Sequence, residues 1–293
     1  MARKGDQVDG LTEAFEAERG KLEAVAYRLL GSHSEAEDAV QEAWIRLDRT
    51  DGIDNLGGWL RTVVTRICLD MLRGRKAPPE DPDELEQLPA VRRTPEDEAL
   101  VADSVSRALL VVLDTLEPAE RIAFVLHDMF AVPFAQIAPL VERNPVATKK
   151  LASRARQKVQ GTPAVPAAEL ARQRRVVSAF LDAARAGDLP AILDVLDPDV
   201  VRRVDTAALA PGMAAELRGA RAVAEGTAAL SGRSQLAELA LVNGEVGVVL
   251  APGGKLFLAI TFTSEADRIT SYDVVADPDR LGGLSIAVLS AER

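Results

Sequence analysis

Residues 132–159 read VPFAQIAPLVERNPVATKKLASRARQKV, and this stretch predicts a helix, a short turn and a second helix. Asn144 is a suitable N-cap for the second helix, and Pro145 suits its first helical position, where no backbone N–H is needed. Pro139 removes a backbone donor inside the first helix, so we expect that helix to bend there. Two helices joined by a tight turn are typical of a helix-turn-helix motif.

The second of these helices is strongly basic, although the chain has a formal net charge of −10. Counting 100° per residue from Leu151 places Ala147, Ala155 and Val159 on its inner side. The opposite side then carries Val146, Lys149, Lys150, Ser153, Arg156 and Gln157, and Arg154, a further base of this helix, is a candidate with them.

Such a face predicts a DNA-recognition helix, because lysine and arginine neutralise phosphates while neighbouring side chains reach base edges. A merely solvated basic face is the alternative interpretation. The acidic total charge does not exclude nucleic acid as a partner, since binding depends on a local basic surface.

Composition limits the classes of protein to which this chain can belong. The 293 residues suffice for about two domains. Cys68 is the only cysteine, which excludes an internal disulfide and fits a reducing compartment. No apolar run approaches the ~18 residues of a membrane span, and the start, MARKGDQVDG, lacks the apolar segment of a secretion signal. We expect a cytoplasmic protein without a membrane segment, a metal or a cofactor.

The residues before the helix-turn-helix also predict helices. Leu11 to Leu47 is periodic with a break at Gly31, and Ser34 with Glu37 predicts a capping box for the helix that follows. A further helix is expected from Trp59 to Leu72. Residues 77–97 are acidic and rich in proline, which predicts a linker before the second helical block.

The last third of the chain has a different texture. Residues 173–196 predict helices separated by a turn at 187–188, and strand-like runs follow from Leu236. Asn243-Gly244 and residues 252–254 are turn signals between those runs. This part predicts an α+β domain with an antiparallel meander.

Three segments in a fixed order carry a family resemblance: SEAEDAVQEAWIRL at 34–47, GGWLRTVVTRICLDMLRGRK at 57–76, and the helix-turn-helix. Over residues 11–160 this order resembles bacterial sigma-70 family factors of the extracytoplasmic-function (ECF) type. The resemblance implies two all-α domains, region 2 and region 4, in a non-enzymatic transcription initiation factor. It implies core RNA polymerase (the β′ clamp helices and the β flap) and promoter DNA as partners.

The resemblance also assigns roles to residues. It implies polymerase binding by Asp38, Gln41, Glu42 and Trp44, although Trp44 could instead be a core residue. Contacts with the −10 element are implied for Arg61, Arg66, Arg73, Arg75 and Lys76. The basic face of the recognition helix is implied to bind the −35 element. Many relatives have asparagine in place of Arg66 and Arg-Gln in place of Lys149-Lys150.

The last third is similar to a SnoaL-like, NTF2-type α+β cone-shaped barrel, which the SigJ-like subgroup of these factors carries. DPDRL, residues 277–281, is close to the Asn-Pro-Asp-Lys-Leu motif of that subgroup, and Asp205 matches the start of a second motif that TAALAPG does not continue. The resemblance implies regulation in cis through an intramolecular contact, with these candidate regulatory residues: Asp205, Asp277, Pro278, Asp279, Arg280 and Leu281.

Five segments are therefore expected: region 2 at 8–76, a linker at 77–97, region 4 at 98–160, a linker at 161–171 and the SnoaL-like domain at 172–293. The alternative is a helix-turn-helix regulator whose cone binds an effector or is weakly catalytic, with Asp205, Arg221, Tyr272 and Asp273 as possible pocket residues. The acidic helix at 34–47 favours the sigma factor, since a free-standing repressor needs no polymerase-docking surface.

Overall fold

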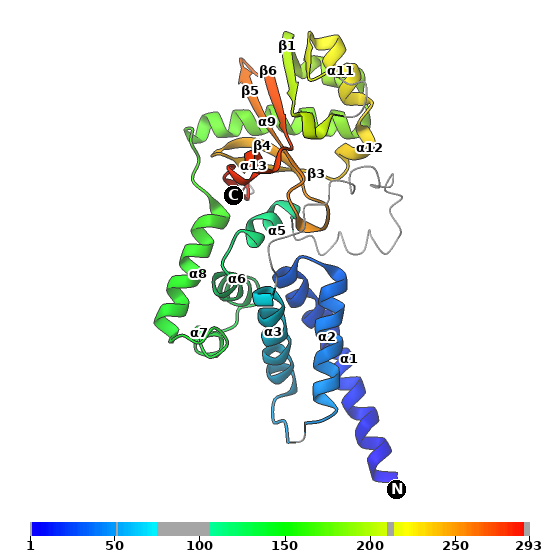
Figure 1. Ribbon diagram of the computed structural model, residues 1–293, viewed down its shortest axis with the longest axis vertical. Coiled ribbons are helices and arrows are strands. Elements are labelled where there is room, and N and C mark those ends of the chain that lie inside the picture. The colour runs from blue at the N-terminus through cyan, green and yellow to red at the C-terminus, as the bar shows by residue number, and fades with distance from the viewer. Residues whose placement is uncertain (1, 51, 75–105, 210–213, 290–293) are drawn as a thin grey trace. The chain divides into compact units, whose positions relative to one another are not determined.

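A computed structural model describes residues 2–50, 52–74, 106–209 and 214–289 (Figure 1). They form two compact units. The first contains the N-terminal helices and residues 113–156. Of the described residues, the second contains 106–112 and the chain from 157 onward. The first unit is helical and the second is α+β, so the predicted multidomain fold class is confirmed.

Three long helices form the base of the helical unit. They are α1 (Ala2–Leu30), α2 (His33–Leu47) and α3 (Leu56–Gly74), and each packs against the other two. Phe15, Leu22, Val25 and Leu29 of α1 are buried at helical spacing. Gly31 ends α1 with φ +77°, a conformation that glycine adopts without strain.

The start of α2 differs from the prediction by two residues. Ser32, not Ser34, is the N-cap, and its hydroxyl accepts a hydrogen bond from the backbone N–H of Glu35 at 3.4 Å. His33, the first helical residue, stacks on Tyr27 of α1 with ring centroids 3.9 Å apart. Because α2 begins at His33, Ser34 lies inside the helix, and the capping box expected from Ser34 and Glu37 does not form.

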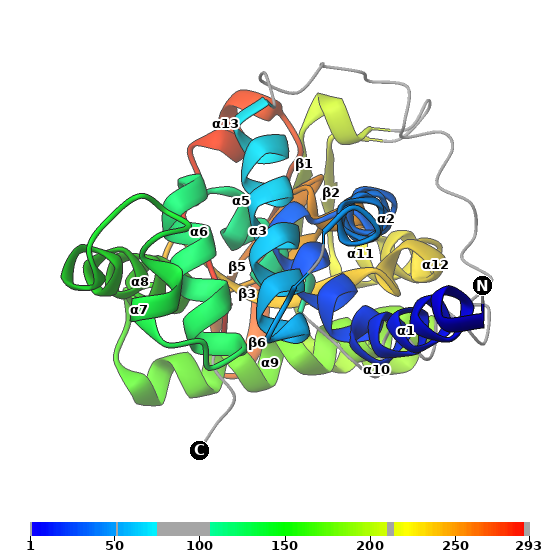
Figure 2. The ribbon, with the colours of Figure 1, turned by 90° about the horizontal axis from the view of Figure 1, so that it is seen from below.

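Residues 113–156 add the end of α5 (Arg107–Asp114), then α6 (Pro118–Phe124), a π-helical turn (Val125–Met129), α7 (Phe134–Ile137) and most of α8 (Pro145–Gln160). Figure 2 shows α3 between α6 on one side and α1 and α2 on the other. Since α7 ends at Ile137, Pro139 lies in the following turn; the predicted bend of a helix was wrong.

The buried stripe of α8 is also shifted from the expected one. Thr148, Ala152, Ala155 and Val159 are buried, whereas Leu151 and Ala147 are only partly buried. Thr148 tolerates burial because its hydroxyl donates to the backbone oxygen of Asn144 at 3.0 Å. The small side chains of this stripe allow α8 to pack closely, and the basic face still points outward.

The α+β unit contains two consecutive helices, α9 (Ala167–Ala186) and α10 (Leu189–Val195), and α9 begins inside the segment expected to be a linker. Within the described residues the sheet has seven strands in the order β2-β1-β6-β5-β4-β3-β7. The strands are β1 (Leu196–Val204), β2 (Glu216–Arg218), β3 (Ala237–Val242), β4 (Glu245–Leu250), β5 (Leu258–Glu265), β6 (Arg268–Val275) and β7 (Ile286–Ala287).

The antiparallel meander predicted after Leu236 is confirmed in β3 to β6. The sequence reasoning missed β1, which pairs with β6 in parallel, and β2. Short elements complete the unit: 3-10 turns at Thr206–Ala208 and Pro252–Gly254, and the helices α11 (Ala220–Ala228), α12 (Ser231–Ser234) and α13 (Pro278–Gly282).

Both faces of the sheet are covered at β3 and β4. Val246, Val248 and Leu250 of β4 pack with Val177 and Leu181 of α9, which runs along one face (Figure 1). On the opposite face, Ala240, Val242, Val249 and Ala259 surround Ala108 of α5. Alternate residues of one strand therefore serve different cores. This explains why β4 reads as an almost continuous apolar run, EVGVVL.

The turn between β3 and β4 is the predicted Asn-Gly turn. Asn243 and Gly244 have φ of +54° and +83°, as a primed hairpin turn requires. A side chain at position 244 would lie 2.7 Å from the backbone nitrogen of Ala164, which donates to the Gly244 oxygen at 2.8 Å. The segment after α8 is thus held against this hairpin.

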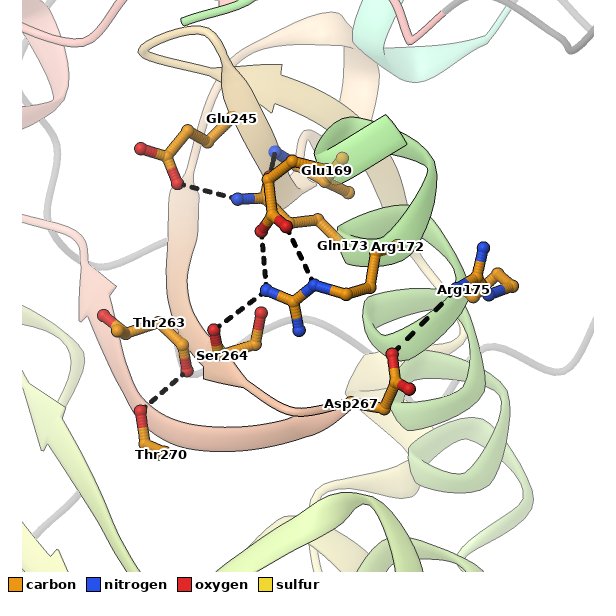
Figure 3. Close-up of polar contacts among 10 residues, drawn as sticks. Glu169, Arg172, Gln173, Arg175, Glu245, Thr263, Ser264, Asp267 and Thr270 are labelled. Atoms are coloured by element: carbon orange, nitrogen blue, oxygen red, sulfur yellow. Dashed lines mark hydrogen bonds and ion pairs between the residues drawn. The ribbon is translucent and has the colours of Figure 1, made fainter. Parts of the chain in front are cut away.

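A polar cluster fastens the first turns of α9 to the sheet (Figure 3). The Gln173 amide donates to Glu245 at 3.0 Å and accepts from the backbone N–H of Val246 at 3.1 Å. Arg172 donates to Glu169 at 2.6 and 2.9 Å and to the backbone oxygen of Ser264 at 3.1 Å. The hydrogen bonds from Arg172 hold the pKa of the Glu169 carboxyl below its ordinary value.

The Gln173→Ala variant tests the importance of this cluster. It leaves the buried N–H of Val246 without its partner, which costs about 1–3 kcal/mol. Hydrogen–deuterium exchange of peptides covering β4 should therefore accelerate roughly 5- to 150-fold. Arg175→Ala is the matched control, because the pair of Arg175 with Asp267 is exposed and spans 4.0 Å. Equal protection in both variants would contradict the assignment.

Candidate nucleic-acid and protein interfaces

The outward face of α8 carries the residues predicted to bind the −35 element. The Asn144 side chain caps the helix by accepting from the N–H of Ala147 at 2.8 Å, as expected. The following predicted residues are exposed: Val146, Lys149, Lys150, Ser153, Arg154 and Gln157. Arg156 is half-buried and donates to Asp128 at 2.5 Å, so its charge is partly neutralised.

The face of α2 predicted to bind polymerase is only partly free. Asp38 and Gln41 are exposed, whereas Glu42 forms an ion pair with Arg46 at 2.8 Å. Trp44 is half-buried and lies against Phe15, with ring centroids 4.8 Å apart. Sequence reasoning missed Ile45, which is 40% exposed. Its spacing from Asp38 and Gln41, seven and four residues, was the signal for one common stripe.

The residues predicted to bind the −10 element lie along and after α3. Arg61 is half-buried, and Arg66 and Arg73 are exposed. Arg66 and Arg73 line a groove with residues 139–142, and the Arg73 guanidinium is 3.9 Å from the Glu142 carboxylate. Arg75 and Lys76 lie outside the described residues.

Most of the predicted regulatory residues lie together, where Asp205 meets the start of α13. Asp205 accepts from the backbone N–H groups of Ala276 and Asp277 at 3.1 and 3.2 Å and pairs with Arg280. Asp277 caps α13 by accepting from the Arg280 N–H at 3.0 Å, Pro278 begins that helix and Asp279 is exposed. The partly buried Leu281 packs against the cluster that contains Ala108.

Only one of the possible pocket residues lies in a pocket. Tyr272 lines a cavity between α9 and the sheet, whereas Asp205, Arg221 and Asp273 do not. Arg221 pairs with Glu225 at 3.0 Å, and Asp273 with Arg203 at 3.6 Å. The reason is strand alternation: where Tyr272 points inward, Asp273 points outward.

A contact not foreseen from the sequence connects Glu238 of β3 with the start of α5. Its carboxylate accepts from the Ser106 hydroxyl at 2.8 Å, from the Ala108 backbone N–H at 3.3 Å and from the Arg107 guanidinium at 3.2 Å. A carboxylate at this place satisfies a free N–H and complements the positive end of the helix dipole.

Family models match both halves of the helical part: residues 14–77 match Sigma-70 region 2 and residues 106–159 match Sigma-70, region 4. Over 92% of its length the chain is 37% identical to the ECF RNA polymerase sigma factor SigJ of Mycobacterium tuberculosis, and covers 92% of that protein. The chain belongs to the ECF sigma factors.

A second relative agrees with this membership. The probable ECF RNA polymerase sigma factor SigI of Mycobacterium tuberculosis is 37% identical over 68% of this chain and 71% of its own length. The crystal structure of Mycobacterium tuberculosis SigJ is 34% identical, covers 93% of this sigma factor and 98% of its own chain, and superposes with a TM-score of 0.46. In the described part of this sigma factor, no helix combines the length and hydropathy needed to cross a bilayer.

Lys149→Ala and Lys150→Ala test the basic face of α8. The electrostatic part of DNA binding is independent of sequence, so a duplex of arbitrary sequence suffices. Each variant should lower the slope of log K against log salt by about 1. The exposed Lys255 of the second unit provides the control variant Lys255→Ala. If all three variants keep the slope of the unaltered protein, the basic face of α8 does not bind DNA.

Proposed function

We propose that this sigma factor binds core RNA polymerase through the exposed face of α2, the −10 element through α3 and the −35 element through α8. It acts in the cytoplasm, without catalysis of its own. Its C-terminal domain restrains region 4 in cis, so that the factor exists in a closed form that polymerase must open.

The contact between Glu238 and α5 carries this proposal. Residues 106–112 belong to the match with region 4, yet they pack on a strand of the C-terminal domain. Glu238 binds three donors at the start of α5, and Ala108 is completely buried among Ala240 and Ala259. Small residues on both sides allow the helix backbone to approach the sheet closely. Loss of such a cap costs about 0.5–2 kcal/mol.

Contacts inside the helical unit support a closed form. The buried Arg121 guanidinium donates to the backbone oxygen of Leu29 at 2.9 Å and to Asp114 at 3.1 Å. Arg28 lies over the Phe130 ring, 5.1 Å from its centroid. These contacts hold region 4 residues against region 2.

Promoter binding is incompatible with such packing. The −10 and −35 elements lie about 25 base pairs apart, which is roughly 85 Å of duplex at 3.4 Å per base pair. Region 2 and region 4 must therefore separate before both elements are bound. Polymerase and promoter select the open form, and every contact that stabilises the closed form lowers their apparent affinity.

Glu238→Ala should consequently raise transcription. Removal of a cap worth about 1 kcal/mol shifts the balance toward the open form about fivefold. The measurement is run-off transcription with core enzyme at limiting sigma factor, on promoters selected from a random library. Glu265→Ala is the control, because Glu265 is an exposed glutamate of the same sheet.

Two outcomes of this experiment would contradict restraint by the C-terminal domain. If Glu238→Ala matches Glu265→Ala in transcription and in affinity for core enzyme, the domain is a passenger. If transcription falls while circular dichroism shows an intact fold, the domain supports initiation instead of restraining it.

Charge reversal on α2 tests the docking surface for polymerase. Asp38→Lys combined with Glu42→Lys should weaken binding to core enzyme at least tenfold, since both carboxylates lie on the helix surface. The fold should persist, because the buried face of α2 is unchanged. Glu13→Lys, on the exposed surface of α1, is the matched control. Undiminished retention of core enzyme by the double variant would remove α2 from the interface.

A further inference from the structure

The C-terminal domain encloses a cavity of about 130 Å³ between α9, α11, α12 and the sheet. Its wall is mostly apolar, with Phe180, Leu250 and Phe257 among the lining residues. The polar lining groups include Arg202, Thr227 and Tyr272, and Arg233 adds a second, exposed base. Among the described residues that line the cavity there is no aspartate or glutamate.

Arg202 is the unusual member of this wall. It lies on β1, between the inward-facing Val200 and Val204, and is only 3% exposed. No described aspartate or glutamate lines the cavity beside it, its Nε has no hydrogen-bond partner, and its guanidinium forms a side-chain hydrogen bond with Tyr272. Arginine remains charged in proteins. A buried charge without an anionic partner destabilises the fold.

The surroundings make room for this guanidinium. A Cβ at position 226, in the middle of α11, would lie 3.0 Å from Nη1 of Arg202, so a side chain there would press on the guanidinium. Glycine inside a helix is less favourable than alanine. Its presence at position 226 leaves room for the guanidinium beside α11.

The two hydroxyl groups of the cavity are oriented by their partners. Thr227 donates to the backbone oxygen of Val223 at 2.8 Å, so the hydroxyl of Tyr272, 2.9 Å from Thr227 Oγ1, donates to it. The Tyr272 oxygen then keeps its lone pairs for other donors. Burial raises the pKa of Tyr272 above its ordinary value, although the hydrogen bond with Thr227, the charge of Arg202 and the hydrogen bond with Arg202 oppose this. Tyr272 is thus a neutral phenol that cannot serve as the counter-ion of Arg202.

We propose that this cavity binds a small organic acid, with the carboxylate on Arg202 and the apolar body among Phe180, Leu250 and Phe257. The planar guanidinium fork matches a carboxylate, and the bond gains strength in apolar surroundings. A cavity of about 150 Å³ accommodates benzene, so the apolar body is about one ring or a short chain in size.

Benzoate is the probe for this site and benzamide its neutral counterpart of equal shape. Titrations of the full-length protein, followed by saturation-transfer NMR and calorimetry in buffer without other carboxylates, should show at least tenfold tighter binding of benzoate. Arg202→Met should abolish this preference and leave benzamide binding unchanged. Arg203→Met is the matched control, since the neighbouring Arg203 is exposed and pairs with Glu216 and Asp273.

Each result decides the proposal. It is supported if unaltered protein and Arg203→Met prefer benzoate while Arg202→Met does not, and if Arg202→Lys recovers part of the preference. It is overturned if the unaltered protein binds benzoate and benzamide equally, or binds neither. That comparison needs no variant, so misfolding of Arg202→Met cannot obscure it. Preference retained in folded Arg202→Met would also overturn the role of Arg202.

Discussion

The carboxylate of Glu238 joins two parts of the chain that lie more than 120 residues apart in sequence. A helix of eight residues is too short to be stable alone, so the order of α5 depends on its cap and on the apolar face beneath it. Both are supplied by β3 and its neighbours. Residues 106–112, the start of the match with region 4, are therefore ordered by the strands on which they pack.

That contact is possible because the sheet is covered on both faces at β3 and β4. Most sheets of this kind leave one face to water and alternate apolar with polar residues. Here Ala240, Val249 and Ala259 face α5, while Ala237 and Val248 line the cavity. Leu281 of α13 packs at the edge of the face that contacts α5. The pair of Asp205 with Arg280 connects α13 to the residue that follows β1. The DPDRL segment thus borders the surface on which Ala108 of α5 lies.

Local chemistry was predictable from the sequence, and tertiary pairing was not. Gly31, Asn144 and Asn243-Gly244 act as expected, because turn and cap geometry depends on adjacent residues. Ser32 with Glu35 and Ser34 with Glu37 fit the same N-terminal pattern, and α2 begins with Ser32 as its N-cap. The alternation of Arg202 with Val200 and Val204 indicates that Arg202 points into the domain. This pattern can be interpreted only when β1 is known to be a strand. The partners of Glu238 had no sequence signal at all.

Neighbouring residues of the same strand face the cavity on one side of the sheet and α5 on the other. Ala237 lines the cavity and Glu238 caps α5; Val248 lines the cavity and Val249 lies in the cluster around Ala108. One layer of strands, β3 and β4, therefore separates the cavity from the cluster around Ala108. A ligand in the cavity changes the packing of α5 only if it binds the packed and unpacked forms with different affinity, and the reverse effect must then be equal.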